Sequence, residues 1–489
     1  MATFLYIAHP SLAGGFQPDE LTSMYLYWST GAIKSLWNSI CFWQGMGRPA
    51  GALYYLPLYH LFWLNPKPYH IVQIAILGGS IPIVYCLARL LSSSSAVAFL
   101  AVLVLYCHVQ LANLVYLGSY IYDVLCGFFY FAALTYYVRI REKDFPLQPF
   151  QLLGFLVLYV CALNSKEMAV TLPLIVLTYE VLRCPRLSNW KDFLGRNWRF
   201  LVPSFIAALL TVPYVYSKTM STYALARVGG YRPAYSWDRF LMNNASFVGE
   251  LLEPYRVANG LLRVFPKAVI ALWATVFIYA LLRRDRTLQL MTFWVIIVPL
   301  PLAFIPIRGG ACLYLVLFGW TIIFGQLAVD VINLSSKCLT LLGRRIRRNS
   351  LPNRRATPDR FSAPMVRAAV VVLLGLVLAI LMQVENRRSG RIRLLVQSGQ
   401  KVVHVIHALS ALDLHPAPGS MILLRQSSLF PNAWHTLFIA ALVWNDHALH
   451  ISVEGASDIG EPEMAKMNYV ISLSESKATL EHVTERSRL

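Results

Sequence analysis

The segment YHIVQIAILGGSIPIVYCLARLL, residues 69–91, carries one charged side chain, Arg89. A helix of this length crosses the roughly 30 Å hydrocarbon core of a bilayer. Nine further apolar runs follow it, at residues 96–116, 121–138, 150–163, 168–182, 200–216, 266–282, 288–307, 312–332 and 366–384. The sequence therefore predicts an all-α polytopic membrane protein.

The composition supports this fold class. Of the 489 residues, 57% are hydrophobic and 14% are charged, and the mean hydropathy is +0.53. Soluble globular proteins carry about 25% charged residues, so the composition excludes a soluble enzyme. The apolar runs are continuous and do not alternate with polar residues, which excludes a membrane β-barrel.

The net charge of +19 reflects the topology of the chain rather than nucleic-acid binding. Lys and Arg cluster beside the ends of alternate spans, at residues 139–143, 183–199, 283–286 and 337–367. Basic loops of membrane proteins lie on the cytoplasmic side. We therefore expect a cytoplasmic linker at 333–365, extracytoplasmic loops at 17–68 and 217–265, and an extracytoplasmic tail. The protein is expected to be multi-pass, in the cell inner membrane or an equivalent membrane.

The two ends of the chain carry separate predictions. Residues 1–14 are shorter than the roughly 20 residues that a spanning helix needs. We expect about 11 transmembrane helices with the first one truncated, either because Met1 is not the true start or because this segment lies tilted at the interface. Residues 1–385 form the predicted transmembrane domain. Residues 386–489 form a predicted small α/β module, with helices at 396–412 and 434–442 and strands at 420–424, 448–453 and 469–473.

An acidic pair, Asp19 and Glu20, stands just outside the first apolar segment. A carboxylate at this position can remove a proton from an acceptor hydroxyl, and it can also coordinate a divalent cation such as Mg²⁺ or Mn²⁺. A simpler interpretation is that Asp19, directly after Pro18, caps the helix that follows. From the spacing alone the two interpretations carry equal weight.

Four further charged residues fall on the same predicted outer side. Asp123 lies at the mouth of a span, where a lone acid is a candidate for acceptor or metal binding or a helix cap. Lys166 and Glu167 form either a phosphate-binding pair or a surface ion pair. Arg308 precedes two glycines and can bind a phosphate or extend to the interface. Acids for sugar transfer and cations for a phosphate are what a lipid-phosphate sugar donor needs.

These motifs resemble those of the GT-C class of integral-membrane glycosyltransferases. The resemblance is carried by the acidic pair, by Arg48-Pro49 and Tyr54-Tyr55-Leu56-Pro57, by Ser165-Lys166-Glu167 with Pro173, and by Arg308 ahead of Leu313-Tyr314. Most similar are the dolichyl- or polyprenyl-phosphate-mannose protein mannosyltransferase-like members. The resemblance covers residues 14–332.

The resemblance implies inverting transfer of a sugar from a polyprenyl phosphate to a protein, glycan or lipid acceptor. In this scheme Asp19 is the catalytic base with Glu20 as its neighbour, Asp123 binds acceptor or metal, and Lys166, Glu167 and Arg308 hold the donor phosphate. Metal dependence varies in the class, so a divalent cation is left open. Two rival hypotheses are a transporter or flippase for lipid-linked sugars and a noncatalytic subunit of an envelope glycan assembly system.

Overall fold

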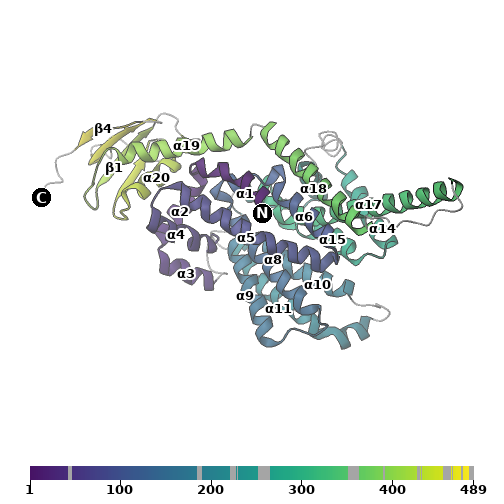
Figure 1. Cartoon of the computed structure of the whole chain (residues 1–489). Coiled ribbons are helices and arrows are strands. Elements are labelled where there is room, and N and C mark those ends of the chain that lie inside the picture. Colours follow the sequence, from purple (N-terminus) through teal and green to yellow (C-terminus); the bar gives the residue numbers. More distant parts are fainter. Residues whose placement is uncertain are drawn as a thin grey trace.

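The protein is described by a computed structural model that places residues 1–41, 47–183, 190–220, 229–251, 265–350, 363–388, 391–426, 432–454, 466–474 and 477–483, with 227, 430 and 464 as single positions. A bundle of helices forms the body, and a small sheet with two helices lies at one end of it (Figure 1). The predicted fold class is confirmed: the chain is mostly helical with a small α/β module at its C-terminal end.

The body is built from α-helices. In chain order they are α1 (Ala2–Ala8), α2 (Pro18–Thr30), α3 (Ala32–Ile40), α4 (Ala50–Phe62), α5 (Pro66–Ser92), α6 (Ser95–Cys107), α7 (Asn113–Tyr116), α8 (Ile121–Arg141), α9 (Pro149–Ser165), α10 (Leu172–Arg183), α11 (Trp190–Met220), α12 (Trp237–Leu251), α14 (Ala268–Leu282), α15 (Arg286–Ile297), α16 (Leu300–Ala303), α17 (Tyr314–Ser350) and α18 (Ala363–Arg388). Short 3₁₀ helices join several of them, at η1 (His9–Ala13), η2 (Val109–Leu111), η3 (Gly118–Tyr120), η4 (Glu167–Thr171), η6 (Gly229–Tyr231) and η7 (Gly310–Leu313).

All ten apolar runs predicted from the sequence are helical over most of their length. Among the described residues, six helices are long and apolar enough to cross a membrane, and a seventh span forms if one bent pair is counted as a unit. Two further predicted spans correspond to the shorter apolar helices α9 and α14. The protein is therefore a multi-pass membrane protein, while the total of about 11 spans and the orientation of the chain stay predictions.

The bent pair interrupts the predicted span 96–116. After α6 the backbone of His108 is extended, and the next helical segment is bent by 53°. The imidazole of His108 accepts a hydrogen bond from the backbone N–H of Gln110 and contacts the carbonyl of Leu251. A side chain that hydrogen-bonds the local backbone offers an alternative to the helical ladder, and this accounts for the break.

Helices α2, α3 and α4 make up the predicted outer loop 17–68. Helix α2 begins with Pro18 at its first position and a capping box, in which the Gln17 backbone N–H donates to the Glu20 carboxyl at 3.0 Å. Proline and a capping box both favour the start of a helix. The buried face of α2 holds Glu20, Leu21 and Met24, and it packs on α4.

The C-terminal module is a four-stranded sheet covered by two helices. Its strands are β1 (Met421–Gln426), β2 (His450–Val453), β3 (Tyr469–Leu473) and β4 (Ala478–Val483), in the order β2-β1-β3-β4. β1 pairs in parallel with β2 and β3, whereas β4 is antiparallel to β3. Helices α19 (Arg391–Ser410) and α20 (Trp434–Trp444) share one apolar core with this sheet. The three strands and two helices expected from the sequence are present, and β4 is an addition.

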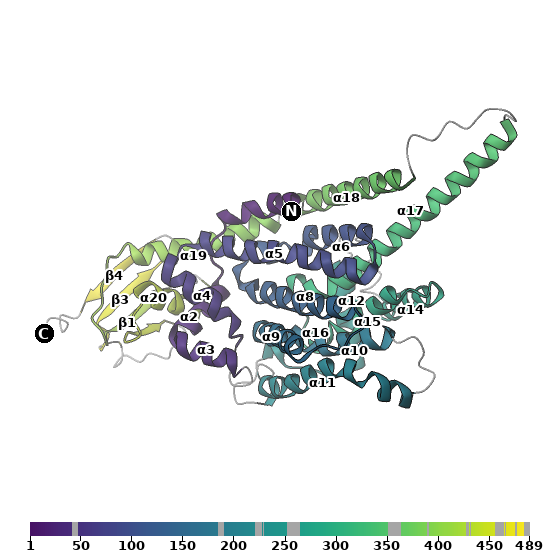
Figure 2. The same ribbon diagram turned by 60° about the horizontal axis from the view of Figure 1, so that its bottom comes forward.

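The module and the free end of α17 lie at opposite ends of the molecule in both views (Figures 1 and 2). The basic segment 337–350 belongs to that free end of α17. The predicted topology places the basic linker and the C-terminal module on different sides of a membrane, and this orientation stays a prediction.

The module is joined to the body through a close backbone contact. A Cβ atom on Gly15 would lie 2.2 Å from the carbonyl oxygen of Gly399, and one on Gly399 would lie 2.6 Å from the carbonyl oxygen of Gly15. Gln17 donates to the Ser398 hydroxyl beside this contact at 3.0 Å. The backbones of α19 and the segment before α2 can approach this closely only because both residues are glycine.

We expect Gly399→Ala to loosen the module. In an ordinary helix interior this substitution stabilises by about 1 kcal/mol. Here the added methyl group meets backbone, and overpacking of this kind costs about 1–3 kcal/mol. Hydrogen exchange should show faster exchange in α19 and α20. Gly79→Ala in α5 is the control, because its methyl group meets only a ring carbon of Phe128 at 3.9 Å. Equal exchange in both variants would contradict the contact.

Candidate functional site

Two adjoining ion pairs form the centre of the candidate site. Lys166 Nζ lies 2.5 Å from Asp123 Oδ1, and both side chains are less than 8% exposed. Arg48 binds Glu167 with two parallel hydrogen bonds, of 3.2 Å from Nε to Oε1 and 2.9 Å from Nη2 to Oε2. The structure therefore brings together Asp123, Lys166 and Glu167 as the sequence analysis expected, and it adds Arg48.

The backbone places these four side chains at breaks in the helices. Lys166 has an extended conformation between α9 and η4, so the chain leaves one helix before Lys166 and enters the next at Glu167. Asp123 lies in the first turn of α8, and Arg48 lies two residues before α4. Tyr122 supports the pairs from α8, because its ring lies 5.1 Å from the guanidinium of Arg48. Helix ends position all the charges on one side of the bundle.

Little water reaches the Lys166–Asp123 pair, whereas the Arg48 and Glu167 side chains are 19% and 25% exposed. Burial raises the pKa of the Glu167 carboxyl, but Arg48 and Lys218 lower it more, and the result is about 2. Burial lowers the pKa of the Lys166 ammonium, but Asp123 raises it more, so Lys166 stays charged. Burial likewise lowers the pKa of the Arg48 guanidinium, but Glu167 raises it more, so the pKa lies well above its usual value. All three groups are ionised at neutral pH.

Two additional cations lie beside the pairs. Lys218, near the end of α11, is buried, donates to the carbonyl of Gly47, and lies 5.5 Å above the ring of Tyr214. Arg308 is half-buried, donates to the carbonyl of Gly230 at 3.1 Å, and lies 4.3 Å above the ring of Tyr231. Within the part of the chain that the structure describes, neither cation forms a salt bridge to a carboxylate. The site thus offers positive charge beyond its own ion pairs.

The loop after Arg308 packs closely against the carboxylate of Glu250. The backbone N–H of Gly310 donates to Glu250 at 2.7 Å, and a Cβ atom on Gly309 would lie 2.0 Å from the carboxylate oxygens of Glu250. Gly310 has a φ of +61°, which favours glycine. The two glycines are therefore required by the packing of Glu250. Arg308 is linked to the ion pairs through Tyr231, which also affects the pKa of Arg48.

The acidic pair is divided between two environments. Asp19 is exposed at the start of α2, and its carboxylate lies 3.9 Å from His435 Nε2 of the module. Glu20 is 1% exposed and faces the bundle, where its carboxyl group occupies the space beside Gly118 that a Cβ atom would fill. Of the pair, only Asp19 is accessible to a substrate. The sequence suggested Asp19 as a helix cap, but the residue whose side chain takes part in the capping box is Glu20.

The burial of Glu20 changes its ionisation. Burial raises its pKa to about 8, against the lowering effect of the backbone N–H groups of Gln17 and Gly118. Tyr54, Tyr55 and Tyr69 surround it and are buried as well. Glu20 is consequently protonated at neutral pH and acts as a hydrogen-bonding group of the core.

The sequence analysis assigned no role to Lys218, Glu250 or Cys312. Cys312 contacts Lys166, with 3.4 Å between Nζ and Sγ. Lys218 carried a usable signal, because a lysine two residues after the apolar run 200–216 stands on the predicted outer side, where cations are less frequent. Arg48 was part of the family resemblance, but its partner Glu167 lies 119 residues away in the sequence.

The charged side chains of the site do not suit a divalent cation. Mg²⁺ and Mn²⁺ prefer several oxygen ligands, usually from carboxylates. Asp123 and Glu167 are each paired with a cation, and within the described ranges no group of three or more His, Cys, Asp or Glu side chains could hold a metal ion. The residues placed here therefore do not fit a bound metal, and no step below depends on one.

We expect Lys166→Met to destabilise the protein strongly. Removing one partner of a buried ion pair leaves an uncompensated charge and costs about 3–5 kcal/mol. The double variant Asp123→Asn with Lys166→Met should recover most of this loss, as measured by thermal unfolding in detergent. Arg283→Met is the control, since its pair with Asp330 is half-exposed at the Arg283 side chain and is worth about 1 kcal/mol or less. Equal losses for both single variants would exclude a buried pair.

We expect Glu20→Gln to remove part of the pH dependence of stability. Folded Glu20 keeps its proton up to a pKa of about 8, whereas the unfolded chain loses it near 4.5. Stability therefore falls as pH rises between these values, by at most about 1.4 kcal/mol per pH unit. Unfolding temperatures from pH 5 to pH 9 should fall less for Glu20→Gln than for wild type. The exposed acid variant Asp238→Asn should follow wild type; identical slopes for all three proteins would contradict the burial of Glu20.

Comparison with known proteins supports the fold. No known protein family and no curated protein matches the sequence. Two solved structures are similar over most of the chain. ArnT from Cupriavidus metallidurans, bound to undecaprenyl phosphate, has a TM-score of 0.53 and 15% identity over 93% of this chain and 85% of ArnT. The archaeal oligosaccharyltransferase AglB from Archaeoglobus fulgidus, in complex with an inhibitory peptide and a dolichol-phosphate, has a TM-score of 0.51 and 13% identity over 96% of this chain and 69% of AglB. The protein therefore has a GT-C-like fold.

Proposed function

We propose that the protein is a membrane glycosyltransferase that moves a sugar from a polyprenyl-phosphate donor to an acceptor hydroxyl. The observation that carries the proposal is the set of cations at one mouth of the bundle. Lys218 and Arg308 lie beside the paired Lys166 and Arg48 without salt bridges of their own in the described chain. Guanidinium and ammonium groups in a partly dry site bind a phosphate well.

Lys166, Lys218 and Arg308 would hold the donor phosphate. Lys166 is fixed by Asp123, and Arg48 by Glu167, so neither of these cations has to be oriented when the donor arrives. Preorganised positive groups stabilise the charge that develops on a departing phosphate. The polyprenyl chain would lie against the apolar helices that flank the site. Glu167 then acts on the donor through Arg48 rather than by direct contact.

Asp19 would act as the general base. Its carboxylate is exposed at the first turn of α2, whereas Glu20 is buried and protonated at neutral pH. Asp19 takes the proton of the acceptor hydroxyl as that oxygen attacks C1 of the sugar. The bond between C1 and the phosphate oxygen breaks, and its electron pair leaves with the polyprenyl phosphate. The configuration at C1 of the sugar is inverted. His435 faces Asp19 from α20 and can orient the carboxylate.

The structural neighbours support this proposal at the level of donor type. ArnT was solved with undecaprenyl phosphate, and AglB with a dolichol-phosphate. The protein shares their fold, and its cation set suits the phosphate of such a lipid. We further propose that Asp19 and the C-terminal module lie on the extracytoplasmic side, with residues 1–385 as the transmembrane domain and 386–489 as the module. The basic helix end at 337–350, at the opposite end of the molecule, supports this orientation.

We expect Asp19→Asn to abolish sugar transfer while donor binding is retained. General-base catalysis contributes about 10²- to 10⁴-fold, so release of free polyprenyl phosphate should fall by at least 100-fold. The assay uses the purified protein in liposomes, a panel of polyprenyl-phosphate sugars, and membrane extract as the source of acceptor. Binding of each labelled donor is measured in parallel.

The matched control for this experiment is Asp238→Asn, an exposed acid in the first turn of α12 that touches none of the site residues described above. It should release polyprenyl phosphate at the wild-type rate. A wild-type protein that binds the donor and never cleaves it would favour the transporter or flippase hypothesis. An active Asp19→Asn variant would show that Asp19 is not the base.

A further inference from the structure

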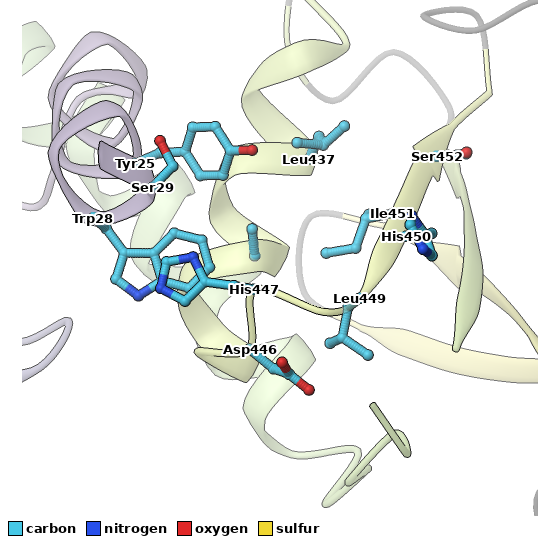
Figure 3. Close-up of a pocket in the computed structure, with 11 residues that line it drawn as sticks. Tyr25, Trp28, Ser29, Leu437, Asp446, His447, Leu449, His450, Ile451 and Ser452 are labelled. Atoms are coloured by element: carbon cyan, nitrogen blue, oxygen red, sulfur yellow. The ribbon is translucent and has the colours of Figure 1, made fainter. Parts of the chain in front are cut away.

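A pocket of about 520 Å³ lies between α2 and the C-terminal module. One wall is the second half of α2, and the other is formed by α20, β2 and the turn that joins them (Figure 3). Small-ligand sites have volumes of about 300–1,000 Å³ and often lie where two domains meet. The pocket is therefore large enough for a small polar molecule, and it is separate from the cation site.

Aromatic side chains of α2 give the pocket rigid walls. The Trp28 ring stacks on His447 with 3.7 Å between centroids and 8° between planes, and its Nε1 donates to Asn445 at 2.7 Å. The Tyr25 ring stacks on Phe438 at 4.6 Å. The Tyr25 hydroxyl points across the space toward Leu437 (Figure 3). This hydroxyl forms no hydrogen bond to any residue that the structure describes, so it is available to a ligand.

The polar groups of the pocket suit a neutral ligand with many hydroxyls. Asp446 presents a carboxylate, one oxygen of which accepts from the backbone N–H of Ala448 at 2.8 Å. His447 and His450 add ring nitrogens. No lysine or arginine is among the described residues that line the pocket, and the Asp446 carboxylate repels phosphates and other anions. Sugars combine hydroxyls that bind such groups with C–H faces that pack on aromatic rings.

The pocket and the candidate base share one helix. Tyr25, Trp28 and Ser29 follow Asp19 by six to ten residues, which corresponds to about 9–15 Å along α2. Around the helix axis Ser29 lies about 80° from Asp19 and Trp28 about 180°, so a ligand that extends from the pocket to Asp19 passes along the Ser29 side of α2.

We propose that this pocket binds the neutral oligosaccharide part of the acceptor, so that the acceptor is a glycan. This inference rests on the proposed transferase function and specifies its acceptor. The Tyr25 hydroxyl donates a hydrogen bond to a sugar hydroxyl and the Asp446 carboxylate accepts one, and the sugar ring packs against the face of Trp28 that is not stacked on His447. The C-terminal half of α2 then binds the oligosaccharide, and the reacting hydroxyl of the acceptor lies near Asp19 in the first turn of the helix.

The test is direct binding of neutral disaccharides to the full-length protein. The protein is placed in phospholipid nanodiscs, because maltoside detergents carry a sugar that would compete. Maltose, cellobiose, chitobiose and α-1,6-mannobiose are measured one at a time by saturation-transfer difference NMR, with glucose 6-phosphate as the anionic comparison. The test variant combines Tyr25→Phe, which keeps the stacked ring, with Asp446→Asn, which keeps an acceptor for Ala448. The control variant combines Tyr235→Phe with Asp238→Asn, two exposed residues outside the pocket.

We expect at least one disaccharide to bind wild type and control alike, with at least a tenfold higher Kd for the test variant and no preference for glucose 6-phosphate. Failure of all four disaccharides to bind, unchanged binding by the test variant, or tighter binding of glucose 6-phosphate would overturn the proposal. Since no donor is present, the result is separate from the transfer assay: sugar binding without transfer would refute the proposed function and leave the pocket assignment standing.

Discussion

The candidate site depends on the pairing of buried charges at one mouth of the helix bundle. Asp123 and Lys166 are both less than 8% exposed, so neither could stay ionised there alone. Lys166 reaches Asp123 because the chain is extended between α9 and η4, and the adjacent Glu167 pairs with Arg48. The two pairs are neutral together. Lys218 and Arg308 add two positive charges beside these pairs and Glu250 adds one carboxylate against Gly309 and Gly310, so the described charges leave a net positive site for an anion.

Helix α2 connects this site with the C-terminal module. Its inner face carries Glu20 and Tyr27, and Tyr27 hydrogen-bonds Tyr122 and the backbone of Arg48. Asp19 and Trp28 point about 180° apart around α2, and both reach the module, where they contact His435 and Asn445. This short helix thus contacts the residues around the ion pairs on one surface and the module on another. This double role explains why a segment of this length holds an acidic pair and several aromatic residues.

The sequence predicted the parts of the fold that depend on local composition. The apolar runs became helices, and β3 has the predicted bounds, because burial follows hydrophobicity along the chain. The sequence did not predict β4, because this edge strand contains the polar residues Glu481 and His482 and is not a continuous apolar run. Counting spans predicted that Asp123, Lys166 and Glu167 share one side of the membrane, and the ion pairs that contain them adjoin. The pairing of Glu167 with Arg48 and the approach of Lys218 depend on how distant helices pack, and no local pattern encodes that.

The acidic pair shows the same limit at the scale of one helix. Successive residues of an α-helix point about 100° apart, so one member of a neighbouring pair can be buried while the other is exposed. Which of the two is buried depends on how α2 is rotated against α4 and Gly118, and this rotation is fixed by contacts on both faces of the helix. Trp28 supplies one of them, since it hydrogen-bonds Asn445 of the module. The module therefore helps to set the orientation of Asp19 even though it lies outside the bundle. A glycan held between α2 and the module would strengthen the same contacts, so binding of the acceptor and alignment of the base would be a single structural event.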